Sequence, residues 1–128
     1  MDITVGRLGH GDESILVDIV VRHKHRLIGI DYAERLLENP SNFLLVAERG
    51  QSPVGFAWGY LLSRLDRDKL QLFIYEVDVS SDARRRGVGT SLMNFVAACT
   101  QENRLMEAFV LADPANVAAH GLYRNIGA

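Results

Sequence analysis

The sequence has one cysteine, little net charge and no long hydrophobic run. The single cysteine, Cys99, excludes an intramolecular disulfide and cannot by itself form a structural zinc site. Fourteen lysines and arginines stand against 16 acidic residues, and this balance disfavours a protein that coats nucleic acid. The richest early apolar stretch, residues 15–21, is interrupted by Asp18 and is much shorter than the ~18 residues of a membrane span. We therefore expect a soluble protein with no metal ion and no nucleic-acid or membrane partner.

The length and the composition indicate one folded domain over residues 1–128. A length of 128 residues fits one domain of ~100–200 residues, and 48% hydrophobic residues is the share of a folded chain. The first seven residues have neither the basic nor the apolar segment of an export signal. Together with the unpaired cysteine, this predicts a cytoplasmic protein.

The spacing of apolar residues predicts the element order β-α-α-β-β-β-α-β-α. Asp12 or Ser14 is expected to cap the first helix, and residues 31–34 form a capping box for the second. An apolar stripe that ends at Cys99 marks the third helix. The expected strands lie at residues 3–5, 43–47, 54–61, 70–79 and 105–112, and the last helix at residues 116–125.

The segment from Val79 to Thr90 carries the strongest functional signal. A strand runs into Arg84-Arg85-Arg86-Gly87-Val88-Gly89-Thr90 and then into a helix. Glycines let the backbone approach an anion, a helix start offers unpaired N–H groups, and arginines add charge. The segment lacks the Gly-Lys-Ser/Thr of a P-loop, and Leu92 replaces the last glycine of the dinucleotide fingerprint. A phosphate-binding loop of another kind is therefore predicted, with a solvated arginine face as the alternative.

Two motifs in this sequence resemble those of one superfamily. Arg84-x-x-Gly87-x-Gly89 is similar to the Arg/Gln-x-x-Gly-x-Gly/Ala signature of the GNAT superfamily of acyl-CoA-dependent N-acetyltransferases. Residues 116–123 resemble its later Asn-x-x-Ala-x-x-Leu-Tyr motif, and the element order also resembles that of the family. The resemblance implies a GNAT-type α/β (α+β) fold. Such a fold has a mixed, mostly antiparallel twisted sheet flanked by helices, and a splayed strand pair receives acetyl-CoA.

A closer resemblance joins this sequence to the aminoglycoside 3-N-acetyltransferases. Residues 73–80, followed by the arginine loop, are similar to the Tyr-Asp-Leu-Ala-Val strand and loop of that group, and Asp113 falls where the group keeps an acid. Relatives continue into one or two further strands, whereas this sequence ends at Ala128. The C-terminal strands therefore look absent. We expect an incomplete sheet whose edge a second subunit covers, as in a homodimer, and a truncated chain fits equally well.

The resemblance also implies which residues hold acetyl-CoA. Its pantetheine arm would pair with the backbone of Val77 and Val79 and would contact Asn116, and Tyr123 would also bind the cofactor. The side chains of Arg84 and Arg85 would flank the phosphates. Backbone N–H groups of the loop would hold the pyrophosphate, namely those of Arg86, Gly87, Val88, Gly89 and Thr90.

Four residues are the candidates for the transfer chemistry. Glu76 is the expected base, and Asp78, on the same strand face by alternation, is a second candidate. The N–H of Val77 would stabilise the developing oxyanion, and Tyr123 would protonate the departing sulfur. Glu76, Asp78 and Asp113 would attract a cationic amine. The alternatives are a surface carboxylate for Glu76 and a core tyrosine for Tyr123.

Other polar and aromatic residues carry weaker signals. Residues 23–25, His-Lys-His, fit a basic helix end better than a metal site. For His120, a structural role is at least as well supported as a position near the active-site cleft. Cys99 is expected to be an unreactive residue of the core. Trp58 is expected either to pack against the sheet or to form a wall of the acceptor pocket.

The leading hypothesis is an N-acetyltransferase that moves an acetyl group directly from acetyl-CoA to a primary amine of a small cationic acceptor, such as an aminoglycoside. The alternatives are a regulatory or inactive acyl-CoA-binding module, a polyamine or peptide acetyltransferase, and a nucleic-acid-binding role for the arginines. Residues 22–39 and 58–68 are expected to supply the acceptor walls.

Overall fold

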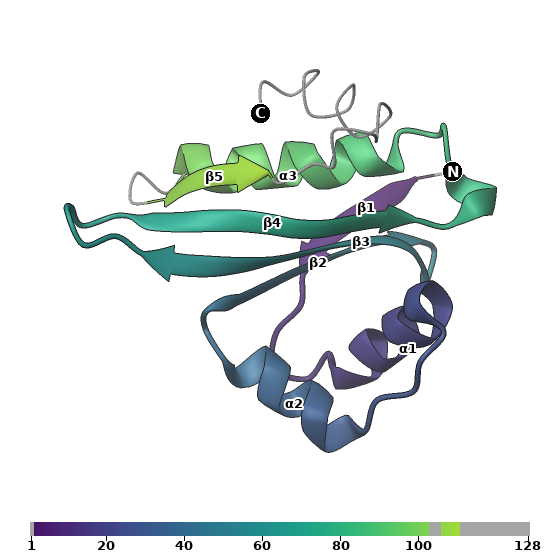
Figure 1. Ribbon diagram of the computed structural model, residues 1–128. Coiled ribbons are helices and arrows are strands. Elements are labelled where there is room, and N and C mark those ends of the chain that lie inside the picture. Colours follow the sequence, from purple (N-terminus) through teal and green to yellow (C-terminus); the bar gives the residue numbers. More distant parts are fainter. Residues whose placement is uncertain (1, 103–105, 111–128) are drawn as a thin grey trace.

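The computed structural model describes residues 2–102 and 106–110. Their sheet has five strands in the order β1-β2-β3-β4-β5, with antiparallel pairs up to β4 and a parallel pair between β4 and β5 (Figure 1). This arrangement confirms the mixed, mostly antiparallel sheet. The strands are β1 (Ile3–Arg7), β2 (Asn42–Arg49), β3 (Ser52–Ser63), β4 (Leu70–Val79) and β5 (Met106–Val110).

Helices cover both faces of the sheet (Figure 1). Helices α1 (Glu13–Lys24) and α2 (Ile30–Glu38) lie on one face, and α3 (Val88–Glu102) lies on the other. A short 3₁₀ turn, η1 (Ser81–Ala83), follows β4. Two apolar clusters result, one between α3 and the sheet and one between α1, α2 and the sheet. Because both faces are covered, β2 has five consecutive buried residues rather than an alternating pattern, residues 43–47.

The helix starts differ in part from the sequence prediction. Asp12 holds the N-cap position of α1, but its carboxylate accepts a hydrogen bond from Gly9 N at 2.8 Å and makes no cap bond. Helix α2 begins after Gly29, so the predicted capping box at residues 31–34 is wrong, and Asp31 lies inside the first turn. Glycine is among the residues favoured at an N-cap, and Gly29 holds this position without a side-chain cap bond. The predicted last helix, residues 116–125, lies outside the described residues.

One extra residue in β4 decides which side chains face α1. Trp58 of β3 lies opposite Glu76, and the next residue, Gly59, lies opposite Ile74, so Tyr75 has no residue opposite it. Ile74 packs against α3. Regular alternation from Ile74 would place Glu76 on that same α3 face. The bulge at Tyr75 instead turns Glu76 towards α1.

Glycine at position 59 is required opposite this bulge. A Cβ atom added there would lie 2.3 Å from the carbonyl oxygen of Phe73, which is a backbone atom and cannot move aside alone. The strands therefore approach each other more closely at the bulge than any other residue type allows.

We expect Gly59→Ala to lower the free energy of unfolding by about 2–3 kcal/mol, because the strands must separate to admit the methyl group. Urea unfolding followed by circular dichroism measures the change. Gly6→Ala is the matched control in β1, where an added Cβ meets no atom within 4 Å, and it should change stability by less than about 0.5 kcal/mol. Equal stabilities of the two variants would contradict the close approach.

Candidate active site

Glu76 and Asp78 lie on the same face of β4, and the end of α1 provides a partner for each. Lys24 Nζ donates to Glu76 Oε2 at 2.5 Å, and His23 Nδ1 lies 2.9 Å from Asp78 Oδ2. The expected shared face of the two carboxylates is confirmed. Neither carboxylate is an isolated acidic group, because each faces a basic side chain of α1.

His23 is buried, and its ring makes one hydrogen bond. Its side chain is 2% exposed, and its ring lies edge-on against Phe56 with 5.1 Å between the ring centroids. Because a carboxylate only accepts, Nδ1 carries the proton and donates it to Asp78. Nε2 is buried and has no hydrogen-bond partner within the described part of the chain. His23 therefore fixes the end of α1 to β4 through a single bond.

Sequence reasoning interpreted residues 23–25 only as a basic helix end and missed the contacts of His23 and Lys24 with β4. A signal was present: His23 follows Ile19 by four residues and Val20 by three, so it continues the apolar stripe of α1. Helical spacing thus places His23 towards the sheet. Nothing in the spacing identifies Glu76 as the partner of Lys24, since that contact spans 52 residues.

A cavity of about 120 Å³ lies between α1, α2 and the sheet beside Glu76. Leucine, isoleucine, valine and aromatic side chains form most of its wall, and Lys24 and Glu76 are its charged members. It is lined by Leu16, Ile19, Val20, Lys24, Leu36, Leu44, Phe56, Trp58 and Glu76. The cavity places the Lys24–Glu76 ion pair beside an apolar space between the two helices and β3.

Three aromatic side chains from β3 and β4 lie together near this cavity. Trp58 Nε1 donates to the hydroxyl of Tyr60 at 3.1 Å, and the ring of Tyr75 lies 6.0 Å from that of Tyr60. Trp58 was expected either to pack or to line the acceptor pocket; it packs against the apolar cluster beneath α1 and α2 and also lines the cavity beside Glu76. Tyr75, the bulge residue, is 61% exposed. These rings form an aromatic surface on β3 and β4, close to Glu76 of β4.

The backbone of β4 beyond the bulge presents polar groups away from β3. Ser80 N donates to the carbonyl of Val54 in β3 at 2.8 Å. Successive backbone groups of a strand point to opposite sides, so the N–H groups of Val77 and Val79 point away from β3. The described pairs between β4 and β5 end at Ile74 and Val110. The strand therefore offers these groups on its β5 side, beyond the last described pair.

The loop after β4 has the geometry of an anion-binding segment. Arg85 and Gly87 have positive φ angles of 64° and 80°, and Gly87 has open space where a Cβ would stand. Ser91 N makes a helical bond to the carbonyl of Gly87, so the N–H groups of residues 88–90 lie in the first turn of α3, where helices leave N–H groups unpaired. The N–H groups of residues 88–90 lie next to an exposed, glycine-containing loop, and they are suited to donate hydrogen bonds to a phosphate group.

The three arginines of this loop differ in their contacts. Arg84 Nε donates to the carbonyl of Val79 at 3.0 Å, and its guanidinium lies 3.6 Å from Asp78 Oδ1. Arg85 and Arg86 are exposed and make no ion pair within residues 2–102 and 106–110. Arg84 thus holds the end of β4, and Arg85 and Arg86 leave their charges free for a ligand.

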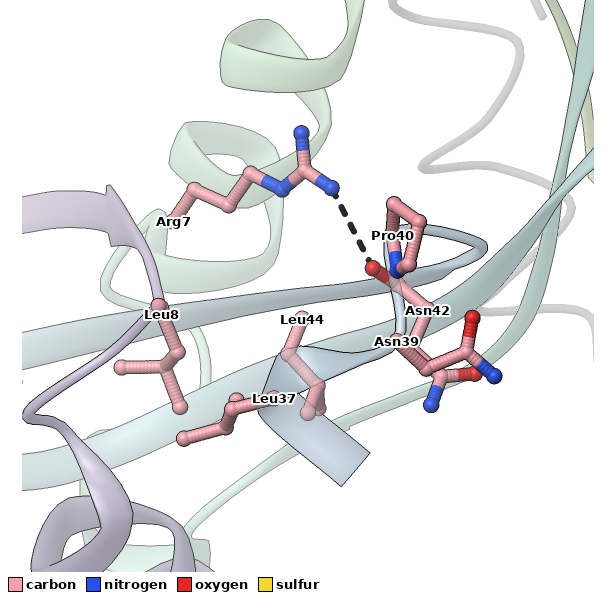
Figure 2. A pocket seen from close by; sticks show the side chains of 8 residues that line it. Arg7, Leu8, Leu37, Asn39, Pro40, Asn42 and Leu44 are labelled. Carbon is pink, nitrogen blue, oxygen red and sulfur yellow. Dashed lines mark hydrogen bonds between the residues drawn. The ribbon is translucent and has the colours of Figure 1, made fainter. Parts of the chain in front are cut away.

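A second cavity, of about 270 Å³, lies where the end of α2 meets the end of β1 and the start of β2 (Figure 2). Leu8, Leu37 and Leu44 form its apolar side, and an Arg7 side-chain nitrogen donates to the carbonyl of Asn42 at 3.2 Å (Figure 2). Only Leu44 is shared with the cavity beside Glu76. Leu37 and Asn39, which belong to the segment expected to wall the acceptor site, line this second cavity, but none of the candidate catalytic or cofactor-binding residues does.

Several residues singled out from the sequence lie outside the described residues, namely Asp113, Asn116, His120 and Tyr123. Cys99 lies on α3 and packs against the core on that face. Burial raises the pKa of the Cys99 thiol, which lowers its reactivity and agrees with the expected inert role. Among the described residues, no group of three histidines, cysteines or acids is arranged to hold a metal ion, and no helix is long and apolar enough to cross a membrane.

The sequence matches the Acetyltransferase (GNAT) family over residues 14–128. The chain belongs to the GNAT acetyltransferase family. It is therefore an N-acetyltransferase, and enzymes of this family use acetyl-CoA. The loop from Arg84 to Thr90 and the outward N–H groups of Val77 and Val79 fit this cofactor, since they offer phosphate donors next to backbone donors that lie beyond the last described β4–β5 pair.

Solved structures share the GNAT fold with this acetyltransferase. An aminoglycoside acetyltransferase from an uncultured soil metagenomic sample, in complex with sisomicin, has a TM-score of 0.89 and 20% identity, covering 98% of this chain and 88% of that chain. The aminoglycoside N-acetyltransferase AAC(6')-Iy in complex with CoA has a TM-score of 0.75 and 16% identity over 98% and 90%. Ribosomal-protein-alanine N-acetyltransferase from Brucella melitensis biovar Abortus 2308 has a TM-score of 0.78 and 21% identity over 99% and 92%. No curated protein sequence matches this chain.

We expect Asp78→Ala to lower the free energy of unfolding by about 1–2 kcal/mol, because it leaves both ring nitrogens of the buried His23 without a partner. Urea unfolding measures the loss. Asp82→Ala is the matched control, since Asp82 is 71% exposed and, within the described part of the chain, pairs only with Arg49; it should cost less than about 0.5 kcal/mol. If both variants lose the same stability, the His23–Asp78 bond does not hold α1.

Proposed function

We propose that this GNAT acetyltransferase moves an acetyl group directly to a primary amine of a small cationic acceptor. The observation that carries the proposal is the position of Glu76. Its carboxylate lies at the wall of the cavity between α1, α2 and the sheet, and the next residue, Val77, points its N–H away from β3. A base and an N–H donor thus stand on consecutive residues of one strand.

Residues of the loop and of β4 would hold the cofactor. Acetyl-CoA supplies the acetyl group as a thioester. Arg85, Arg86 and the N–H groups at the start of α3 would bind its phosphates, and the backbone of Val77 and Val79 would bind its arm. Arg84 supports this arrangement indirectly, because its bond to the Val79 carbonyl joins the loop to the strand.

Glu76 would take a proton from the acceptor, since an amine attacks only in its neutral form. The N–H of Val77 would donate to the carbonyl oxygen as negative charge develops on it. Tyr123, proposed from its place in the second motif, would give a proton to the departing sulfur.

The acceptor side favours a cationic molecule with both polar and apolar surface. Glu76 supplies a negative charge, and the Trp58 and Tyr60 rings supply an aromatic surface on which a cation or a sugar ring can lie. The aminoglycoside acetyltransferases of the same fold support an aminoglycoside acceptor, and modification at a 3-amino group is part of this proposal. The ribosomal-protein-alanine acetyltransferase of the same fold makes a peptide N-terminus the second candidate.

We expect Glu76→Gln to lower kcat by about 10²–10³-fold, because the amide cannot accept the proton. Thiol release from acetyl-CoA, measured across pH with a panel of aminoglycosides, diamines and peptides, gives the rate. Glu48→Gln on strand β2 is the control and should retain activity. If Glu76→Gln and Tyr123→Phe both leave the pH profile of turnover unchanged, the assigned mechanism is wrong. Cofactor binding with no amine turned over would favour a regulatory acyl-CoA-binding module.

We expect Arg86→Gln to weaken the binding of coenzyme A by about fivefold, because one charged donor to the phosphates is lost. Isothermal titration calorimetry with coenzyme A measures the dissociation constant. Arg67→Gln removes an exposed arginine that pairs with Asp66 and Glu107, far from the loop in sequence, and should leave binding unchanged. An equal loss in both variants would show that the loop arginine makes no specific contact.

The homodimer remains part of the proposal, with a second copy covering an edge of the sheet. Sedimentation equilibrium distinguishes the dimer from a monomer.

A further inference from the structure

The environment of Glu76 contains an amine supplied by the protein itself. A general base must lie within about 2.6–3.2 Å of the group whose proton it takes. Lys24 Nζ lies 2.5 Å from Glu76 Oε2. The lysine therefore occupies the position relative to the base that the nitrogen of an acceptor would have to occupy.

Lysine is rare in this sequence, which makes its place at the site informative. The chain has two lysines, Lys24 and Lys69, and twelve arginines. Arginine forms stronger, two-pronged contacts with carboxylates than lysine, and it serves in most ion pairs of the described residues. Lysine differs in being a primary amine, which is the group that this family acetylates when it is presented in the acceptor position.

The side chain of Lys24 is accessible, whereas that of its neighbour His23 is buried. The Lys24 side chain is 47% exposed, and that of His23 is 2% exposed. Lys24 is also the last residue of α1, and His25 after it ends the helix with a φ of 55°. His23 thus holds the end of α1 against β4, and the accessible amine of Lys24 lies at the wall of the cavity beside Glu76.

The charges around the site are balanced while Lys24 stays on Glu76. On β4 the charged groups are Glu76 and Asp78, and they face Lys24 from α1 and Arg84 from the loop. An acceptor ammonium that approaches Glu76 has to displace the ammonium of Lys24. Acetylation of Lys24 would remove that competitor, because an amide carries no charge.

We propose that Lys24 is an internal acetyl acceptor of this site and that its acetylation frees Glu76 for the substrate amine, an inference that rests on the function proposed above for Glu76. The nitrogen forms a bond to the acetyl carbon as the carbon–sulfur bond of the thioester breaks. The ammonium loses two protons in total. One passes through Glu76 to water, and the other ends on the coenzyme thiol.

The first test is incubation of the full chain with acetyl-CoA and no added amine, followed by mass spectrometry of its peptides. Both lysines face a carboxylate, but only Lys24 lies beside the strand proposed to hold the thioester, so Lys24 should gain one acetyl group about a hundredfold faster than Lys69. Lys69 is a matched control, since it is 34% exposed and pairs with Glu107 at 3.1 Å. Glu76→Gln should reduce the rate at Lys24 to that at Lys69, and dilution of the protein should leave the fractional rate unchanged.

Four outcomes of this test would overturn the proposal. Equal rates at Lys24 and Lys69 would mean chemical acetylation by the thioester alone. A fractional rate that falls on dilution would mean transfer between molecules. Turnover of added amines without acetylation of Lys24 would leave the proposed function standing and remove the internal acceptor, whereas the absence of both reactions would overturn both.

The second test needs no acetyl-CoA. Lys24→Gln removes the charge as acetylation would, and Lys24→Arg keeps it. Calorimetric binding of a linear diamine such as putrescine should be about two- to fivefold tighter for Lys24→Gln than for Lys24→Arg, because an exposed ion pair on Glu76 no longer competes. Equal affinities would contradict the claim that Lys24 occupies the position of the acceptor nitrogen.

Discussion

The geometry of the site depends on the one-residue bulge at Tyr75. Side chains of a strand alternate between its faces, so an extra residue exchanges the faces of everything that follows. Before the bulge, Leu72 and Ile74 pack against α3. After it, Glu76 and Asp78 face α1, while Val77 and Val79 take the α3 side. Without the bulge, two carboxylates would be directed into the apolar core against α3, where an unpaired charge is costly.

The bulge also separates the two functions of β4. The strand pairs with β5 up to Ile74, which ties it into the sheet. In the proposed function, the outward N–H groups past the bulge would bind the cofactor, and the acidic side chains would bind an acceptor on the α1 side. One strand would then bring the cofactor and the acceptor together from different directions, which direct transfer between them requires.

Most of the fold could be predicted from the sequence, because its signals are local. The buried run at residues 43–47, the glycine-rich loop and the apolar stripe of α3 each specify an element without long-range information. The start of α2 was missed because Asp31 and Glu34 have the residue types of a cap, whereas glycine at position 29 takes that place through its backbone. Glu76 and the loop could be singled out from their motif. The bonds to His23 and Lys24 could not, since they depend on how α1 crosses the sheet.

The long sequence separation of the contacts between α1 and β4 has a consequence for folding. His23 and Asp78 are 55 residues apart, and Lys24 and Glu76 are 52 apart. Local structure forms quickly, whereas contacts of high sequence separation must wait for the closure of the chain between them. Helix α1 lies near the start of the chain, but the strand that holds it must first be paired with β3. We therefore expect the His23–Asp78 and Lys24–Glu76 contacts to form late, after the hairpin of β3 and β4.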